Sequence, residues 1–219
     1  AAKSKANQSY AIATSALRNA SNGKTFIEEA FKDTGIEINI ISGDREAELI
    51  YKGVNSAIQL SETPSLIMDI GGGSTEFIIA NKHGILWKHS FEIGSSKILK
   101  LFTISNPLTI EENNILTQFF NEQLSLLATE LLKHNINQII GCSGSFETIG
   151  DVMLHSAKHF TKHNYKHIQI PKVEFLKIHE LLINSTFEDR LNTPGIPFSR
   201  IDTIVPAVVF MNYICNKIN

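Results

Sequence analysis

The sequence predicts an α/β protein built from two units. The first observation is an alternation of strand-like and helix-like apolar patterns between residues 10 and 58. The second is an isoleucine-rich stretch, residues 65–80, interrupted by three consecutive glycines. The third is the length of 219 residues, which suits one large domain or two small ones. We therefore expect residues 1–60 and residues 61–219 to form two units of mixed strands and helices.

Composition and charge exclude several classes of protein. Hydrophobic residues make up 42% of the chain and its net charge is -2, so it is neither a disordered chain nor a strongly basic nucleic-acid binder. No apolar run approaches the roughly 20 residues of a membrane-spanning helix. Cys142 and Cys215 lack metal-ligand spacing and indicate buried thiols in a reducing compartment. We expect a cytoplasmic protein that binds neither nucleic acid nor membrane.

The first unit is expected to alternate strands and helices. Residues 10–15 predict a short buried strand, and residues 36–41 predict a second strand. Residues 24–34 have helical spacing and end before Gly35, a suitable left-handed terminator. Ser42-Gly43-Asp44 supplies a turn and an N-cap for a helix over residues 45–58. This β-α-β-α order predicts parallel strands with crossover helices.

The second unit is expected to have a β-β-β-α-β-α core. Residues 65–70, 74–80 and 85–93 predict three strands, with residues 81–84 as a hairpin turn. Residues 138–141 predict the fourth strand. The expected helices are a short one after Gly94, a long one from Thr109 to about residue 133 that opens with a capping box, one from residue 143 to about 160, and two over residues 172–184 and 201–216, where Pro206 must lie at a cap or kink.

The loop between the first two of these strands carries the most chemical information. An apolar strand delivers Asp69 to its end, and Glu76 returns on the next strand. The glycines between them allow the backbone to turn tightly and to offer its N–H groups to an anion. Two carboxylates beside such a loop suit a phosphate and a divalent cation. The candidate phosphate ligands in this loop are Gly71, Gly72, Gly73, Ser74 and Thr75.

Three segments together resemble the exopolyphosphatase/guanosine pentaphosphate phosphatase (Ppx/GppA) family. They are residues 69–76 (DIGGGSTE), 13–23 (ATSALRNASNG) and 41–54 (ISGDREAELIYKGV), in the family's order. Residues 93–95 and 200–207 match weaker family positions. The resemblance implies an actin-like, two-lobe α/β fold whose second lobe is ribonuclease H-like, with the active site between the lobes. It also implies hydrolysis of a terminal phosphoanhydride, in inorganic polyphosphate or in guanosine pentaphosphate.

The resemblance assigns roles by position. It implies that Glu46 is the general base toward the attacking water and that Arg18 contacts substrate phosphates. Asp69 and Glu76 are implied to bind a divalent cation, Mg²⁺ or Mn²⁺, or the attacking water. Without the resemblance, Glu46 reads as a first-turn acid favoured by the helix dipole and Arg18 as a surface arginine. The remaining candidate phosphate ligands, from the weaker matches and the second glycine loop, are Gly94, Ser95, Gly144 and Arg200.

The sequence departs from the family at two places. Arg45 and Glu48 stand where the family more often has Glu and Arg, which bears on substrate preference. No D-x-G-[ST]-N phosphate motif precedes Tyr10, so we expect an incomplete first lobe whose strands have unpaired edges. We accordingly expect residues 1–219 alone to bind phosphate weakly and to hydrolyse polyphosphate poorly.

Two other functions remain open. One is an ATP-dependent kinase or ATPase of the same superfamily, which would bind its nucleotide at residues 141–145. This segment is otherwise a plain strand–helix junction. The other is a polyphosphate- or alarmone-binding module without activity. The oligomeric state is not determined by the sequence, and a homodimer is compatible with it.

Five of the eight histidines lie in or near one basic segment. Their spacing lacks a compact ligand pattern such as H-E-x-x-H, so we expect a solvated basic surface rather than a metal site. They are His155, His159, His163, His167 and His179.

Overall fold

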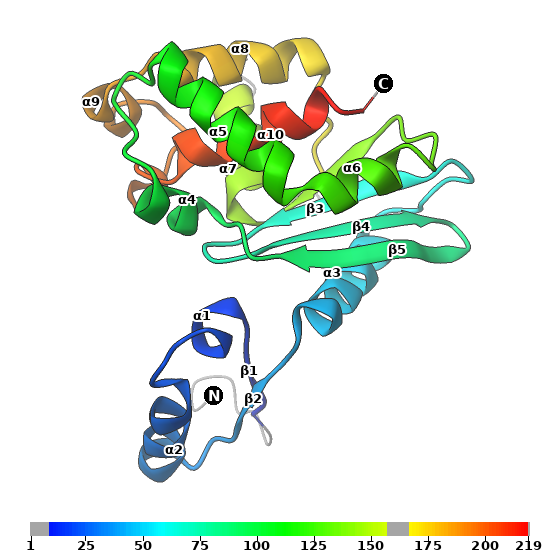
Figure 1. The fold of residues 1–219 in the computed structure, drawn as a ribbon, viewed down its shortest axis with the longest axis vertical. Helices are drawn as coiled ribbons and strands as arrows, with labels where there is room; N and C mark the ends of the chain where they lie inside the picture. Colours follow the sequence, from blue (N-terminus) through cyan, green and yellow to red (C-terminus); the bar gives the residue numbers. More distant parts are fainter. Residues whose placement is uncertain (1–8, 157–166, 219) are drawn as a thin grey trace.

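A computed structural model describes residues 9–156 and 167–218 of the chain. Figure 1 shows a small unit at the N-terminal end, a long helix leading away from it, and a larger unit in which helices cover one face of a sheet. The predicted α/β class is confirmed.

The small unit consists of two short parallel strands and two helices. Strand β1 (Ala11–Ala13) pairs with β2 (Ile38–Ile40), as predicted. Helix α2 (Gly23–Thr34) ends at Gly35, whose φ of 69° is left-handed. The expectation of a buried strand over residues 10–15 is wrong, because the chain turns after Ala13 into helix α1 (Ser15–Arg18) and Ile12 is 56% exposed. A sheet of only two strands leaves such side chains uncovered within the described residues.

Helix α3 (Gly43–Ala57) connects the two units. Ser42 is its N-cap, and the Ser42 hydroxyl accepts a hydrogen bond from the Arg45 N–H at 3.2 Å. The helix begins two residues earlier than predicted, because Gly43 and Asp44 form its first turn rather than a separate loop.

The larger unit contains a four-stranded sheet with the order β5-β4-β3-β6. Strands β3, β4 and β5 are antiparallel neighbours, whereas β6 is parallel to β3. This topology confirms the predicted β-β-β-α-β-α core. The strand bounds are β3 (Ser65–Ile70), β4 (Thr75–Asn81), β5 (Gly84–Phe91) and β6 (Ile139–Cys142).

Side-chain alternation gives the sheet two different faces. Leu66 and Met68 of β3, with Phe77 of β4, belong to the large core beneath the helical layer. Ile67 and Ile78 belong to a second core, which α3 covers with Ala47 and Val54. The predicted boundary at residue 60 stays a prediction, although α3 precedes it and packs on this sheet.

The helical layer differs from the prediction in two details and agrees with it on Pro206. The capping box of Thr109 and Glu112 is present, but the long helix breaks at Leu124, a buried residue with ψ of 20°. A short helix and a 3₁₀ turn were not predicted. Pro206 lies in the first turn of the last helix, where it costs no hydrogen bond. The elements are α4 (Ser95–Leu101), α5 (Ile110–Gln123), α6 (Ser125–Leu131), α7 (Ser143–Ser156), α8 (Lys172–Ile183), α9 (Phe187–Leu191), η2 (Phe198–Arg200) and α10 (Ile204–Cys215).

No helix in the described part of the chain is both long and apolar enough to cross a bilayer.

Candidate active site

Two carboxylates lie directly opposite each other on the face of the sheet that α3 covers. Asp69 of β3 and Glu76 of β4 are cross-strand partners. The period-two alternation places them on the same face as Ile67 and Ile78, which pack against α3. Glu46 lies in the first turn of α3, so three acids from three elements gather there.

Burial and mutual repulsion perturb these acids. Burial raises the pKa of Glu76 to about 7, and the negative charges of Glu46 and Asp69 add to the rise. The Ser90 hydroxyl counteracts it by donating a hydrogen bond to Glu76 Oε1 at 2.7 Å. Burial also raises the pKa of Asp69, and the charge of Glu147 contributes further. Such a concentration of buried carboxyl groups is typical of functional sites.

Arg18 partly neutralises Glu46. Its Nη1 donates to the Ile41 carbonyl at 2.9 Å and to Glu46 Oε2 at 3.4 Å. Burial nevertheless dominates, so the pKa of Glu46 is raised above its ordinary value. The side chains of Arg18 and Glu46 are 19% and 20% exposed, which leaves Glu46 accessible to a water molecule.

The glycine loop is held between two helices. The N–H groups of Ser95 and Lys97, at the start of α4, donate to the Gly71 and Gly72 carbonyls at 3.0 Å each. On the other side, Gly73 lies so close to α1 that a Cβ atom there would be 2.6 Å from Ser15 Oγ. Among the described residues, no hydrogen bond uses the N–H groups of Gly72 or Gly73. These two groups are therefore available to an anion. Phosphate binding by this loop stays a prediction.

The other predicted ligands of this loop are buried. Gly94 allows the backbones to meet, since a Cβ there would be 2.4 Å from the Gly72 carbonyl carbon. Thr75 is fully buried and donates its hydroxyl to the Ile93 carbonyl at 2.5 Å. Ser74 and Ser95 are 2% and 1% exposed. Within the loop, the Gly71 N–H donates to the Ser74 carbonyl at 2.9 Å.

The second glycine loop lies at the end of β6, beside β3. Ser143 has a left-handed φ of 69° and donates its hydroxyl to the Ile70 carbonyl at 3.1 Å. Arg200 donates from Nη1 to Ser145 Oγ at 3.2 Å, and its guanidinium lies against Gly144. The structure thus brings Gly144 and Arg200 together near the strand that carries Asp69.

Sequence reasoning missed several polar residues of this region. Ser90 is paired with Glu76 across β4 and β5, which a hairpin register would have revealed. Glu147 follows Ser143 by one helical turn, so helical spacing could have identified it. Glu92 and Asn19, which contact each other at 2.6 Å, come from segments far apart in sequence and left no local signal.

The donor set fits a divalent cation bound mainly by two carboxylates. Within the described residues, no three His, Cys, Asp or Glu side chains are placed to hold one metal ion. Mg²⁺ commonly uses only one or two protein carboxylates and takes waters and phosphate oxygens for the rest. Burial is the main cause of the raised pKa values of Asp69 and Glu76, and the charges of neighbouring carboxylates add to it. Both residues therefore suit Mg²⁺ or Mn²⁺.

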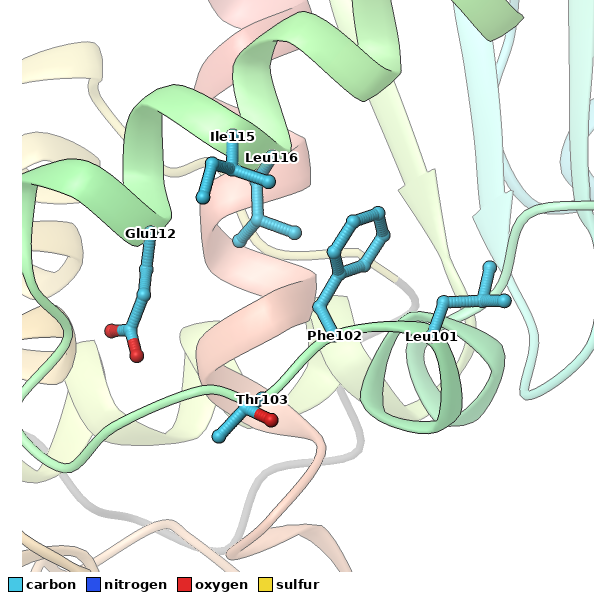
Figure 2. A pocket seen from close by; sticks show the side chains of 6 residues that line it. All are labelled: Leu101, Phe102, Thr103, Glu112, Ile115 and Leu116. Carbon is cyan, nitrogen blue, oxygen red and sulfur yellow. The ribbon is translucent and has the colours of Figure 1, made fainter.

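A pocket of about 310 Å³ lies elsewhere, between the end of α4 and the start of α5 (Figure 2). Apolar side chains such as Phe102 and Leu116 line most of it. Its only acid, Glu112, is engaged in hydrogen bonds with Ser105 and Thr109. None of its lining residues belongs to the acidic site.

The predicted histidine-rich surface is described only in part, because His159 and His163 lie outside the described residues.

The fold and the site define an α/β protein with a glycine-rich loop between two carboxylates. The sequence profile of the Ppx/GppA phosphatase family matches residues 1–219, and the chain belongs to that family.

Individual relatives agree with this assignment. A bifunctional 3-dehydroquinate synthase/phosphatase of Fusobacterium nucleatum is 40% identical over 140 residues, 63% of this chain and 21% of that protein. A putative exopolyphosphatase of Haemophilus influenzae is 28% identical over 92% of this chain and 60% of its own. The chain thus spans less than two thirds of the length of these relatives.

Solved structures show the same fold. The crystal structure of an exopolyphosphatase from Cytophaga hutchinsonii matches with a TM-score of 0.95 and 32% identity, over 100% of this chain and 70% of that one. A Ppx/GppA enzyme of Aquifex aeolicus, 21% identical, matches with a TM-score of 0.78 over 98% of this chain and 70% of that one. The fold class predicted from the sequence is confirmed by these structures.

Proposed function

We propose that the protein hydrolyses a terminal phosphoanhydride, releasing orthophosphate from inorganic polyphosphate or from the 5′ end of guanosine pentaphosphate. The observation that carries this proposal is the meeting of Glu46, Asp69 and Glu76 beside a loop whose Gly72 and Gly73 N–H groups are available. The names of the exopolyphosphatase relatives support the substrate class.

Glu46 is suited to act as the general base. Burial raises the pKa of Glu46 above its ordinary value, which makes it a stronger proton acceptor than an ordinary glutamate. Arg18 fixes the carboxylate by donating a hydrogen bond to Oε2. Arg18 also keeps positive charge beside the reacting phosphate.

The loop and the two sheet carboxylates are suited to hold the phosphoryl group. The Gly72 and Gly73 N–H groups would bind its oxygens and stabilise the charge that develops on them. Asp69 and Glu76 would hold Mg²⁺ or Mn²⁺, which supplies further positive charge in phosphoryl transfer.

Fewer observations support the two alternative functions. An ATP-dependent kinase would place its nucleotide at the second glycine loop, where Arg200 lies against Gly144. A binding module without activity would not need a base of raised pKa.

We also propose a cytoplasmic location, which the two free cysteines support. A homodimer and the absence of nucleic-acid or membrane partners stay predictions.

The test is phosphate release from polyphosphate by the wild type, Glu46→Gln and the matched control Glu130→Gln. Glu130 lies on α6 and pairs with Lys133 three residues away. We expect Glu46→Gln to keep polyphosphate binding and to lose about 10²–10⁴-fold in turnover. Because we expect residues 1–219 to hydrolyse polyphosphate weakly, the experiment compares the turnover of each variant with that of the wild type. Equal turnover in Glu46→Gln and Glu130→Gln would exclude Glu46 as the base.

A further inference from the structure

Glu92 lies among two cationic side chains and one side-chain amide, which come from both units of the fold. Its Oε2 accepts a hydrogen bond from Asn19 Nδ2 at 2.6 Å and is 3.8 Å from Lys97 Nζ. Its Oε1 is 3.7 Å from Arg18 Nη2. Arg18 and Asn19 come from the end of α1, Glu92 follows β5, and Lys97 belongs to α4.

The Arg18 guanidinium is incompletely satisfied in this arrangement. Its Nη2 is buried and makes no hydrogen bond among the described residues. The 3.7 Å contact with Glu92 is an ion pair too long to be a hydrogen bond. A buried guanidinium N–H without an acceptor is costly, so a closer anionic oxygen at this point would be favourable.

This group of donors adjoins the glycine loop. Asn19 Nδ2 also lies 3.3 Å from Ser15 Oγ, the atom against which Gly73 packs. The Lys97 N–H bonds the Gly72 carbonyl. Figure 1 shows α1 facing the end of the sheet where this loop lies. Two anionic groups joined in one molecule could therefore occupy the loop and the donor group together.

We propose that Arg18, Asn19 and Lys97 form a second phosphate subsite, and that the Glu92 carboxylate occupies it until a substrate phosphate displaces it. The inference rests on the proposed function and makes it more specific. It requires a substrate with at least two linked phosphates, one at the glycine loop and one at this subsite. Glu92 is then a specificity residue, which sets how many phosphates a ligand needs in order to bind.

If the subsite exists, two substitutions should change the affinity for tripolyphosphate in opposite directions. Glu92→Gln removes the competing charge and frees Arg18 and Lys97, so tripolyphosphate should bind about three- to tenfold more tightly. Lys97→Gln removes a subsite cation, so tripolyphosphate should bind more weakly by a similar factor. Orthophosphate, which occupies only the loop, should bind the wild type and both variants equally. The matched control is Glu62→Gln, whose ion pairs with Lys82 and His83 lie at the far hairpin.

The experiment is titration calorimetry of the 219-residue chain with orthophosphate, tripolyphosphate and GTP, in the presence of Mg²⁺. Tighter binding of both triphosphates to Glu92→Gln supports a subsite for linked phosphates of either source, and tighter binding of one alone identifies that source. Unchanged or weaker binding of both triphosphates to Glu92→Gln overturns the inference, because Glu92 would then only join α1 to α4. That outcome does not contradict the proposed function. A chain that binds none of the three anions contradicts both.

Discussion

At the scale of single residues, the site depends on carboxyl groups that the sheet forces together. Asp69 and Glu76 face each other across two antiparallel strands, and burial raises the pKa of both. The pKa of Glu76, about 7, means that the site carries a proton part of the time near neutral pH. A divalent cation would replace that proton and favour the ionised form.

Asp69→Asn tests the role of these carboxyl groups in cation binding. Because Asn has no charge, we expect the Mg²⁺ concentration that half-maximally raises the melting temperature to increase about tenfold or more. Glu76→Gln should act in the same direction. Thermal unfolding at a series of Mg²⁺ concentrations measures both effects.

The control for this measurement is Asp33→Asn, an exposed acid at the end of α2. It should respond to Mg²⁺ like the wild type. If Asp69→Asn and Glu76→Gln also respond like the wild type, the cation site is misassigned.

At the scale of elements, strand β5 determines the position of α3 and therefore of Glu46. Lys88 of β5 donates to Glu48 Oε1 at 2.6 Å and to the Asp44 carbonyl at 3.1 Å. Gly43 packs against Ser90 so closely that a Cβ atom would be 2.3 Å from the Ser90 Cβ. The first two turns of the helix are thus fixed to the same strand that supplies the hydrogen bond to Glu76.

The Glu48–Lys88 contact predicts a pH dependence of stability. The hydrogen bond from Lys88, and then that from Arg45, lower the pKa of Glu48 from 4.5 to about 2. A depressed carboxyl pKa stabilises the fold above the unfolded value, and this stabilisation is lost as the pH falls from 4.5 to about 2. We expect the difference in unfolding free energy between the wild type and Glu48→Gln to shrink over that range.

Urea unfolding at a series of pH values measures this difference. Glu130→Gln is the matched control, since Glu130 pairs with Lys133 only three residues away and joins no separate elements. A difference that is constant from neutral pH to pH 2 would show that the contact with Lys88 does not contribute to stability.

At the scale of the whole molecule, α3 serves both units. It follows β2 of the small unit, and its buried side chains complete the core on one face of the large sheet. The large unit therefore depends on a segment that lies before residue 61. Ile67 and Ile78, both fully buried, would face water without it.

A comparison of two shortened chains tests this dependence. Residues 61–219 should be less stable than residues 42–219, because exposing a buried isoleucine costs about 1.5–3 kcal/mol. The denaturant midpoint of each chain gives the comparison, with residues 42–219 as the control that keeps α3 but loses the small unit. Equal midpoints would show that α3 is dispensable for the large unit.

The sequence by itself determined the order of the strands and most of the helices, because alternation, helical periodicity, capping residues and glycines are local signals. Through the resemblance of contiguous motifs to a family, it also predicted roles for Glu46, Arg18 and the loop from Asp69 to Glu76, and these roles stay predictions. The break at Leu124 and the exposure of Ile12 were not predictable in this way. They depend on which surfaces meet after folding.

Only the tertiary structure decided which of these residues act together. Thr75 lies within the predicted phosphate loop, yet its hydroxyl is directed to the Ile93 carbonyl. Glu92 carries no motif, yet it joins Arg18, Asn19 and Lys97. Hydrogen bonds and ion pairs depend on distance in space, and a residue's neighbours in space come from strand register and helix packing rather than from its neighbours in sequence.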